Sequence, residues 1–390
     1  MGALESFDRA YEALPASAKT PQRRAAMDAF LAQGLPSREA EAWKYTDLAP
    51  LAALDETALA PEAGSSALAS TEFSDGLDAL NLAYAAGGLE QTIAANTRLD
   101  TPIRPEARAH QRHRLRLERG SEATLILNTS GAAAFQTIFA EIDVGPGANL
   151  HLIRISDAGR DAHRLTRVKL RLARDARADV VSIDLGGKLS RHDLSVDLAE
   201  PGAEIHVNGL FAPLGDGHVD NHTVIEHRAP HCVSRESFRG IARDKARAVF
   251  NGMIRVHKDA QKTDSEQRVA SLLLSPGAEI NAKPELEIYA DDVKCAHGAT
   301  FGQLDDEALF YLRSRGLPTE EARTLLLWTF AHEVLQHVRL DDVRARITRR
   351  VLHHLPNGAA MEQLLDADEP VVSEVSPPPG KGHGVREHTS

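Results

Sequence analysis

The sequence predicts an all-β core between two helical regions, because three hydrophobic periods follow one another along its 390 residues. Apolar residues recur at helical spacing in the first hundred positions. From about Gly120 they alternate with polar residues, which is typical of strands with one buried face, and after Gly302 the helical spacing returns. Hydrophobic residues at 42% and charged residues at 26% indicate a folded globular chain, whose length suggests about two to three domains.

The first helical region contains one segment with clear start and stop signals. Thr20 is a candidate N-cap, Pro21 suits the first helical position, and Gly34 follows as a stop signal. Met27 and Phe30 fall on one face between these signals. We therefore expect a helix that packs against another part of the protein.

The core contains regular strand patterns and a recurring turn. Aliphatic residues occupy every second position in 138–144, 168–172 and 194–198. A Pro-Gly-Ala-x-aliphatic pattern begins at Pro146, Pro201 and Pro276. Reuse of one turn suggests the stacked rungs of a solenoid. The irregular spacing of the turns is nearly as compatible with a large β-sandwich.

After the core, the sequence predicts three helices and an unstructured end. The first helix covers 304–315, and the second is expected to be capped by Thr319 and to run to about His337. The third covers 341–354. Residues 369–390 have no core-forming pattern, so we expect them to be disordered.

Composition argues against several classes of function. A formal net charge of −11 argues against binding nucleic acid or an anionic membrane through bulk charge. No apolar run reaches the ~18 residues of a membrane span, and the first residues lack a signal-peptide pattern, so we expect a cytoplasmic protein. Only Cys232 and Cys295 are present, which excludes a disulfide framework and an iron–sulfur cluster held by four thiolates of this chain alone.

The most informative stretch is Asp291 to Gly298, which contains Cys295 and His297. If this stretch continues the preceding strand, the two side chains share one face, about 6.6 Å apart along the strand. A thiolate and an imidazole on one face are suitable ligands for a soft metal centre. Lys294 would lie on the opposite face and lower the pKa of the thiol little. A buried cysteine beside a hydrogen-bonded histidine is the simpler interpretation of this stretch taken alone.

Four histidines lie close together in the core, at His218, His222, His227 and His231. Imidazoles suit iron, copper and zinc, but these spacings match no regular face. Exposed or hydrogen-bonded histidines explain the group better, and a metal role for it is a secondary hypothesis. The role of the neighbouring Cys232 is open.

Two further segments resemble known binding motifs but lack residues that those motifs require. Residues 186–190 lack the glycine and hydroxyl positions of a phosphate-binding loop, and we expect a strand turn there. His332 and His337 are five residues apart, which rotates them about 140° around a helix instead of placing them on one face as in a zinc protease.

Ordered motifs cover most of the chain, from about residue 37 to residue 330. They read EAWKYTDL at 41–48, ALNLA at 79–83, VFNG at 249–252, QKTD at 261–264, LLS at 273–275, PELEI at 284–288, KCAHGAT at 294–300, GQLD at 302–305 and FYLRSRGL at 310–317. In this order the motifs resemble the SufB/SufD family of iron–sulfur cluster assembly proteins.

The resemblance implies a fold that decides between the solenoid and the sandwich. Family members have a right-handed parallel β-helix between helical domains. We therefore expect an N-terminal helical region at 1–105, a β-helix at 106–302, a C-terminal helical domain at 303–368 and a disordered tail at 369–390.

The resemblance also implies a non-enzymatic function with defined partners. SufD-type members pair with SufB through the β-helix and bind the SufC ATPase through the C-terminal helices, here 305–354. Two cysteines and the chain length favour the SufD type over the SufB type. By resemblance, His297 with Cys295 beside it would be a ligand to a transient iron or iron–sulfur cluster shared with SufB, with no cofactor permanently bound. The edges of the β-helix would also allow a homodimer when the chain is alone, and the sequence leaves the stoichiometry open.

Three alternatives follow from the same residues. A SufB-like scaffold would hold the nascent cluster or a flavin itself, which two cysteines make less suitable. A β-helix polysaccharide-active enzyme would use Asp291 and Asp292, but it predicts an export signal and more aromatic residues than the 5% present. In a purely structural partner, Cys295 and His297 would be inert.

Overall fold

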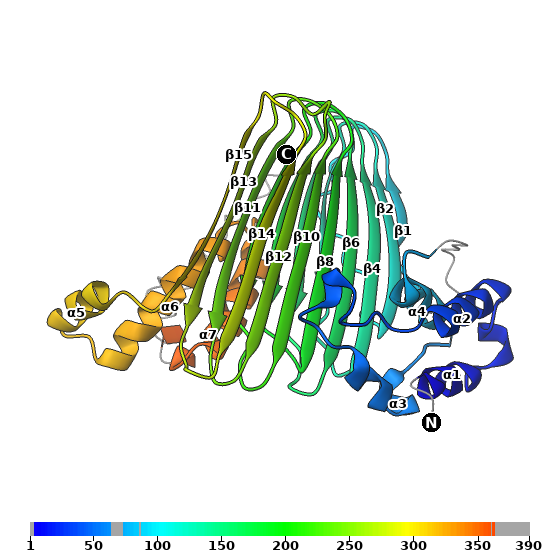
Figure 1. Ribbon diagram of the computed structural model, residues 1–390, viewed down its shortest axis with the longest axis horizontal. Coiled ribbons are helices and arrows are strands. Elements are labelled where there is room, and N and C mark those ends of the chain that lie inside the picture. Colours follow the sequence, from blue (N-terminus) through cyan, green and yellow to red (C-terminus); the bar gives the residue numbers. More distant parts are fainter. Residues whose placement is uncertain (1–3, 64–72, 86, 360, 363–390) are drawn as a thin grey trace, which may run out of the picture.

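Two parallel β-sheets wound from one chain form the centre of the protein (Figure 1). The computed structural model describes residues 4–63, 73–85, 87–359 and 361–362. From the second strand onward, successive strands alternate between the sheets, so each turn of the chain adds a strand to both sheets beside the previous turn. This is the parallel β-helix that the motifs implied, and the sandwich alternative is wrong. The predicted disordered tail lies outside the described residues.

The sheets, called sheet A and sheet B below, differ by one strand. Sheet A has the order β1 (Glu90–Ile93), β2 (His110–Leu117), β4 (Phe135–Val144), β6 (His163–Leu172), β8 (Leu189–Leu198), β10 (His218–His227), β12 (Arg247–Val256) and β14 (Glu279–Ile288). Sheet B has the order β3 (Glu122–Asn128), β5 (Asn149–Ser156), β7 (Arg177–Asp184), β9 (Glu204–Phe211), β11 (Val233–Ala242), β13 (Asp264–Leu273) and β15 (Lys294–Gly302).

Every second side chain of both sheets points into the solenoid, and the apolar ones among them form one continuous column. In β6 the predicted alternation is confirmed, because Val168, Leu170 and Leu172 are buried in this column. Large rings fit inside because glycines face them. A Cβ atom at Gly209 of β9 would collide with the ring of Phe238 on the neighbouring strand β11, so this ring has room only because residue 209 is a glycine.

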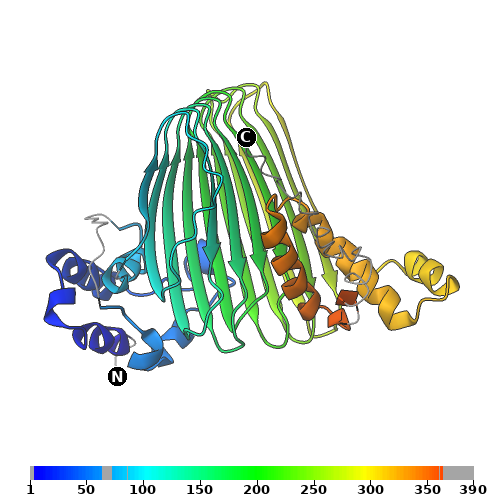
Figure 2. The same ribbon diagram turned by 180° about the vertical axis from the view of Figure 1, so that it is seen from behind.

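The N-terminal helices cover the outer face of sheet A near its first strands (Figures 1 and 2). They are α1 (Glu5–Glu12), α2 (Pro21–Gln33), α3 (Glu56–Leu59) and α4 (Gly76–Tyr84), with short 3₁₀ turns at Ala16–Ala18, Glu41–Trp43 and Ala49–Ala53. The predicted start of α2 is confirmed, since the Thr20 hydroxyl accepts a hydrogen bond from the Arg23 amide at 3.3 Å. Met27 and Phe30 are fully buried against this domain and the sheet.

The C-terminal helices are α5 (Asp306–Ser314), α6 (Thr319–Leu335) and α7 (Asp341–His354). Two of the three, α6 and α7, pack on the outer face of sheet B, on the other side of the solenoid (Figure 2). The expected cap is wrong by one residue, because Pro318 with its extended backbone is the N-cap and Thr319 is already helical. None of the helices in the described ranges is long and apolar enough to cross a lipid bilayer.

A buried ion pair attaches the segment EAWKYTDL at 41–48 to the solenoid wall. The guanidinium carbon of Arg191 lies 3.7 Å from the ring centroid of Trp43, and Arg191 Nη1 donates to Asp220 Oδ2 at 2.6 Å. The Thr46 hydroxyl donates to the same carboxylate oxygen. Burial opposes ionisation of Asp220, but Arg191 overcomes it and holds the pKa of that carboxyl below its ordinary value. The N-terminal segment is therefore attached by charge and ring stacking together.

Replacing Asp220 by Ala leaves the buried Arg191 with Asp193 as its remaining carboxylate partner, and we expect the free energy of unfolding to fall by about 3 kcal/mol. Urea unfolding followed by circular dichroism measures the change. Glu279→Ala is the matched control, because its pair with Arg247 is exposed and should contribute about 1 kcal/mol or less. Equal losses in both variants would contradict the role of the buried pair.

Candidate functional site

The two ends of the solenoid differ in how their edge strands are covered. At the first end, residues before β2 lie along β3: the Leu99 amide donates to the Glu122 carbonyl at 2.9 Å, and the Ile103 amide to the Thr124 carbonyl at 2.8 Å. At the last end, β14 pairs only with β12 and β15 only with β13 among the described residues. The last turn therefore presents two strand edges with unused backbone hydrogen-bonding groups.

Cys295 and His297 both lie on β15, the edge strand of sheet B. Their pairing partners on β13 are Ser265 and Gln267, which are buried inside the solenoid. The predicted shared face is thus the inner face of the last turn. Cys295 is half-buried against the apolar column, whereas His297 is exposed, and neither lies deep in the interior. Lys294 is exposed beside them.

A row of hydroxyl groups leads through the interior to Cys295. Ser234, Ser265 and Cys295 are register partners on three successive strands of sheet B. The Ser234 and Ser265 hydroxyls are 2.7 Å apart, and the His227 ring nitrogen Nε2 lies 2.9 Å from Ser234 Oγ. Burial and, to a lesser extent, the Asp264 carboxylate raise the pKa of the Cys295 thiol. The free chain therefore keeps this sulfur protonated, and a metal would displace the proton on binding.

A second polar row leads to His297, and the sequence analysis missed it. Glu236, Gln267 and His297 are register partners, and Gln267 Nε2 donates to Glu236 Oε2 at 2.5 Å. Burial raises the pKa of Glu236 to about 7, although the hydrogen bond from Gln267 opposes the shift. The signal in the sequence was a glutamate and a glutamine at positions where the strand period calls for apolar residues.

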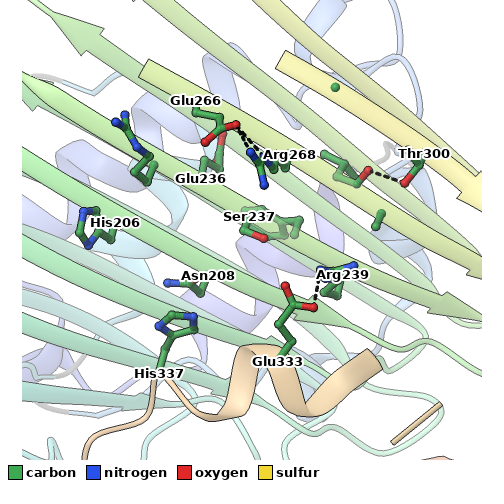
Figure 3. Close-up of a pocket in the computed structure, with 15 residues that line it drawn as sticks. His206, Asn208, Glu236, Ser237, Arg239, Glu266, Arg268, Thr300, Glu333 and His337 are labelled. Atoms are coloured by element: carbon green, nitrogen blue, oxygen red, sulfur yellow. Dashed lines mark hydrogen bonds and ion pairs between the residues drawn. The ribbon is translucent and has the colours of Figure 1, made fainter. Parts of the chain in front are cut away.

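A groove of about 610 Å³ runs along the outer face of sheet B toward β15 (Figure 3). Its floor contains Asn208 and Ser237, and Thr300 of β15 forms its far side. The ion pair of Arg239 with Glu333 joins the floor to α6. The groove thus connects the terminal strand to the C-terminal helices.

All large hydrophobic side chains that the described residues expose lie within one short part of the sequence. They are Ile288, Tyr289, Phe301, Phe310 and Tyr311. The first three lie on or next to the edge strands β14 and β15, and the last two lie on α5. Helix α5 has no buried residue and projects away from the rest of the molecule (Figure 1). Clustered exposed apolar groups mark interaction surfaces.

The four-histidine group does not converge on one point. His218 and His222 face outward, where His218 Nε2 lies 2.9 Å from Thr46 Oγ1 and His222 Nε2 lies 3.0 Å from Asp220 Oδ1. His227 points inward and His231 sits in a turn. Within the described ranges there is no group of three or more metal-ligating side chains arranged around one point. Cys232 is fully buried in the apolar column.

The remaining motifs have local structural roles. Gly186 and Gly187 form the turn before β8 with positive φ angles, as expected for a strand turn. His332 lies on α6 with its ring centroid 5.0 Å from that of Trp328, and His337 follows the end of the helix. Asp292 pairs with Lys262 on the neighbouring turn of the solenoid.

Comparison with known proteins identifies the class to which this β-helix belongs. The family described as "SUF system FeS cluster assembly, SufBD core domain" matches residues 102–330. The chain belongs to the SufB/SufD family of iron–sulfur cluster assembly proteins, which confirms the resemblance seen in its motifs.

Individual relatives refine this assignment. The chain is 33% identical to the iron–sulfur cluster assembly protein SufD of Escherichia coli (strain K12), over 92% of this chain and 98% of that protein. An iron–sulfur cluster assembly SufBD family protein of Synechocystis is 36% identical over 56% of this chain and 48% of its own length. A SufBD family protein of Mycobacterium leprae is 29% identical over 62% of this chain and 63% of its own length.

Glu236→Gln should remove one component of the pH dependence of stability. The folded carboxyl has a pKa of about 7 against an ordinary value of 4.5, so the folded state binds the extra proton between these values. Wild-type stability should therefore fall as pH rises through this window, by on the order of 3 kcal/mol relative to the variant.

Urea unfolding at about pH 5 and about pH 8 gives the free energy of unfolding of both proteins at each pH. The change in this free energy between the two pH values contains the contribution of Glu236 in wild type only, so the difference between the proteins isolates it from other titrating groups. Glu266→Gln, on the outer face of the next strand, is the control and should follow wild type. If the free energy of unfolding changed equally with pH in Glu236→Gln and in wild type, the Glu236 carboxyl would not be held neutral in the folded protein.

Proposed function

We propose that this chain is a non-enzymatic scaffold component of the Suf assembly that pairs with SufB and binds the SufC ATPase. One observation carries the proposal: the exposed large hydrophobic residues of the described chain gather on the open end of the solenoid and on α5. Two such surfaces in one small region fit a protein that binds two partners. The cytoplasm is the proposed location, consistent with two unpaired cysteines.

The open end of the solenoid is the proposed SufB surface. Strands β14 and β15 each have one free edge, and pairing with strands of another β-helix would satisfy their backbone groups. Ile288 and Phe301 border these edges and would supply apolar contact. A second copy of this chain could use the same edges, so they would also allow a homodimer without SufB.

Helices α5 to α7 form the proposed SufC surface. Helix α6 packs on sheet B and holds α5 away from the solenoid, which leaves Phe310 and Tyr311 accessible. Phe310 is 71% exposed, an unusual state for a phenylalanine on a regular helix. ATP chemistry is assigned to SufC, because the sequence at 186–190 lacks a phosphate-binding loop.

Cys295 and His297 are the proposed ligands to the iron or iron–sulfur cargo. They lie on the same inner face of the edge strand, where a partner strand would approach them. A thiolate and an imidazole are two ligands of the kinds that iron–sulfur centres use. The other ligands would come from SufB, so separating the two chains would divide the ligand set and release the cargo.

Two single substitutions should each weaken binding to one partner and leave binding to the other unchanged. Phe301→Ser should weaken SufB binding by about tenfold or more and leave SufC binding unchanged, whereas Phe310→Ser should do the reverse, because an apolar anchor contributes mainly to its own interface. Binding of each purified partner, measured by biolayer interferometry, tests all four combinations. Circular dichroism checks that both variants fold. Retention of both partners by both variants would contradict the assignment of the surfaces.

His297→Ala should reduce the iron content of the co-expressed assembly by about tenfold or more without preventing its formation, because it removes a ligand and no core contact. Iron and acid-labile sulfide are measured after anaerobic purification with SufB and SufC. Lys294→Ala, an exposed change on the opposite face of the same strand, is the control. Unchanged iron in an intact His297→Ala assembly would end the ligand assignment.

A further inference from the structure

A cavity of about 420 Å³ lies where the N-terminal segment crosses the beginning of the sheet A strands. Its inner wall comes from the start of four strands, β6, β8, β10 and β12, and from the turns that precede them, including Lys188 and Lys245. Its outer wall comes from the segment that contains Arg38 and Tyr45. The volume is within the range of small-molecule binding sites.

The cavity is rich in positive charge although the whole chain has a net charge of −11. Four side chains in its wall are cations: Arg38, Lys188, Lys245 and Arg247. The two carboxylates in the wall are already engaged. Asp216 pairs with Lys188 at 2.6 Å, and Asp47 Oδ1 accepts a hydrogen bond from the Ala49 amide at 2.9 Å.

Two of these cations have no carboxylate partner in the described parts of the chain. Lys245 makes no side-chain ion pair, and Arg38 makes none beyond a hydrogen bond from its Nε to the Lys44 carbonyl at 3.1 Å. Arg247 has only a long contact of 3.6 Å with Glu279. Cations that share a concave wall without acidic partners favour a bound anion.

One buried histidine, His163, and one half-buried histidine, His218, add polar groups to the same cavity. His163 is 7% exposed, and its Nδ1 has no hydrogen-bond partner among the described residues. Burial lowers the pKa of His163, and the nearby Arg164 and Lys188 lower it further. Burial likewise lowers the pKa of His218, and Arg247 adds to that effect. Both rings are therefore neutral at pH 7, and the unpartnered nitrogen of His163 is a polar atom that folding has left unsatisfied.

The rest of the wall is apolar. Tyr45, Pro50 and Leu51 line it from the N-terminal segment, and Leu189 lines it from β8. One charged side and one side with an aromatic ring suit a ligand that combines an anionic group with a flat or apolar body. The guanidinium and ammonium groups match a phosphate group, which accepts several hydrogen bonds and carries up to two charges.

We propose that this cavity binds a phosphorylated small molecule, with Arg38 and Lys245 as the main contacts to the phosphate and the Tyr45 side as the contact to the remainder. Neither Arg38 nor Lys245 lies on the edge strands assigned to SufB or on the helices assigned to SufC. It also differs from a phosphate-binding loop, because side chains of separate turns, and not consecutive backbone amides, provide the contacts.

Isothermal titration calorimetry of the full chain with inorganic pyrophosphate, AMP and adenosine tests the proposal. We expect one site for pyrophosphate and for AMP, and none for adenosine at about 1 mM. The double variant Arg38→Gln/Lys245→Gln should weaken both phosphate ligands by about tenfold or more, since each charged contact contributes about 1 kcal/mol or more.

Lys169→Gln/Arg171→Gln is the matched control, because it removes the same charge from exposed positions of β6 outside the cavity. This control should bind both phosphate ligands as wild type does. The proposal is overturned if neither phosphate ligand binds, if the cavity variant binds them unchanged, or if the control loses binding to the same extent. Binding of adenosine with the affinity of AMP would also overturn it, because the phosphate would then contribute nothing.

Discussion

Backbone pairing between successive turns is the constraint on which this structure depends. Each strand of a parallel β-helix satisfies its amide and carbonyl groups only through the turns before and after it, so the chain must deal with the first and last turns separately. At the first end, the backbone around Leu99 and Ile103 lies along β3 and satisfies it. At the last end nothing equivalent covers β14 and β15 in the described structure, and the exposed apolar residues collect there.

The two outer faces of the solenoid are used by different parts of the chain. The N-terminal helices pack on sheet A through one apolar cluster, and helices α6 and α7 pack on sheet B through another. The interior column is a third cluster, separate from both. Because the sheets lie between the two helical groups, the cavity beside Lys245 and the surface around Phe310 belong to opposite faces of the molecule.

The fold class could be predicted because its signals are local. The alternation in β6 and the N-cap of α2 depend on neighbouring residues, and the structure confirms both. The family motifs also located Cys295 and His297 on one strand. The rows that lead to them were not predictable, because Glu236 and Gln267 become neighbours only through the register of two strands. The alternation of apolar and polar residues along each strand does not determine which residues of β11 and β13 pair.

The contacts that attach the N-terminal segment to the solenoid could not be predicted from the sequence. Trp43 was recognised as part of a motif, but its contact with Arg191 joins residues far apart in the sequence. The same applies to Thr46 and Asp220. Motif recognition identifies which residues are characteristic of the family, whereas the physical reason for each becomes visible only when distant strands are placed beside it.

The polar residues inside the last turns affect where the solenoid unfolds locally. In a solenoid each turn contacts only its neighbours, so its stability is approximately a sum of local contributions. The final turn has one neighbour instead of two, and the polar Glu236 and Gln267 stand where earlier turns place aliphatic residues. This end should fray first, on a faster hydrogen-exchange timescale than the turns near β6, while the remainder stays folded. A partner that docks there would act as the missing neighbour and slow that fraying.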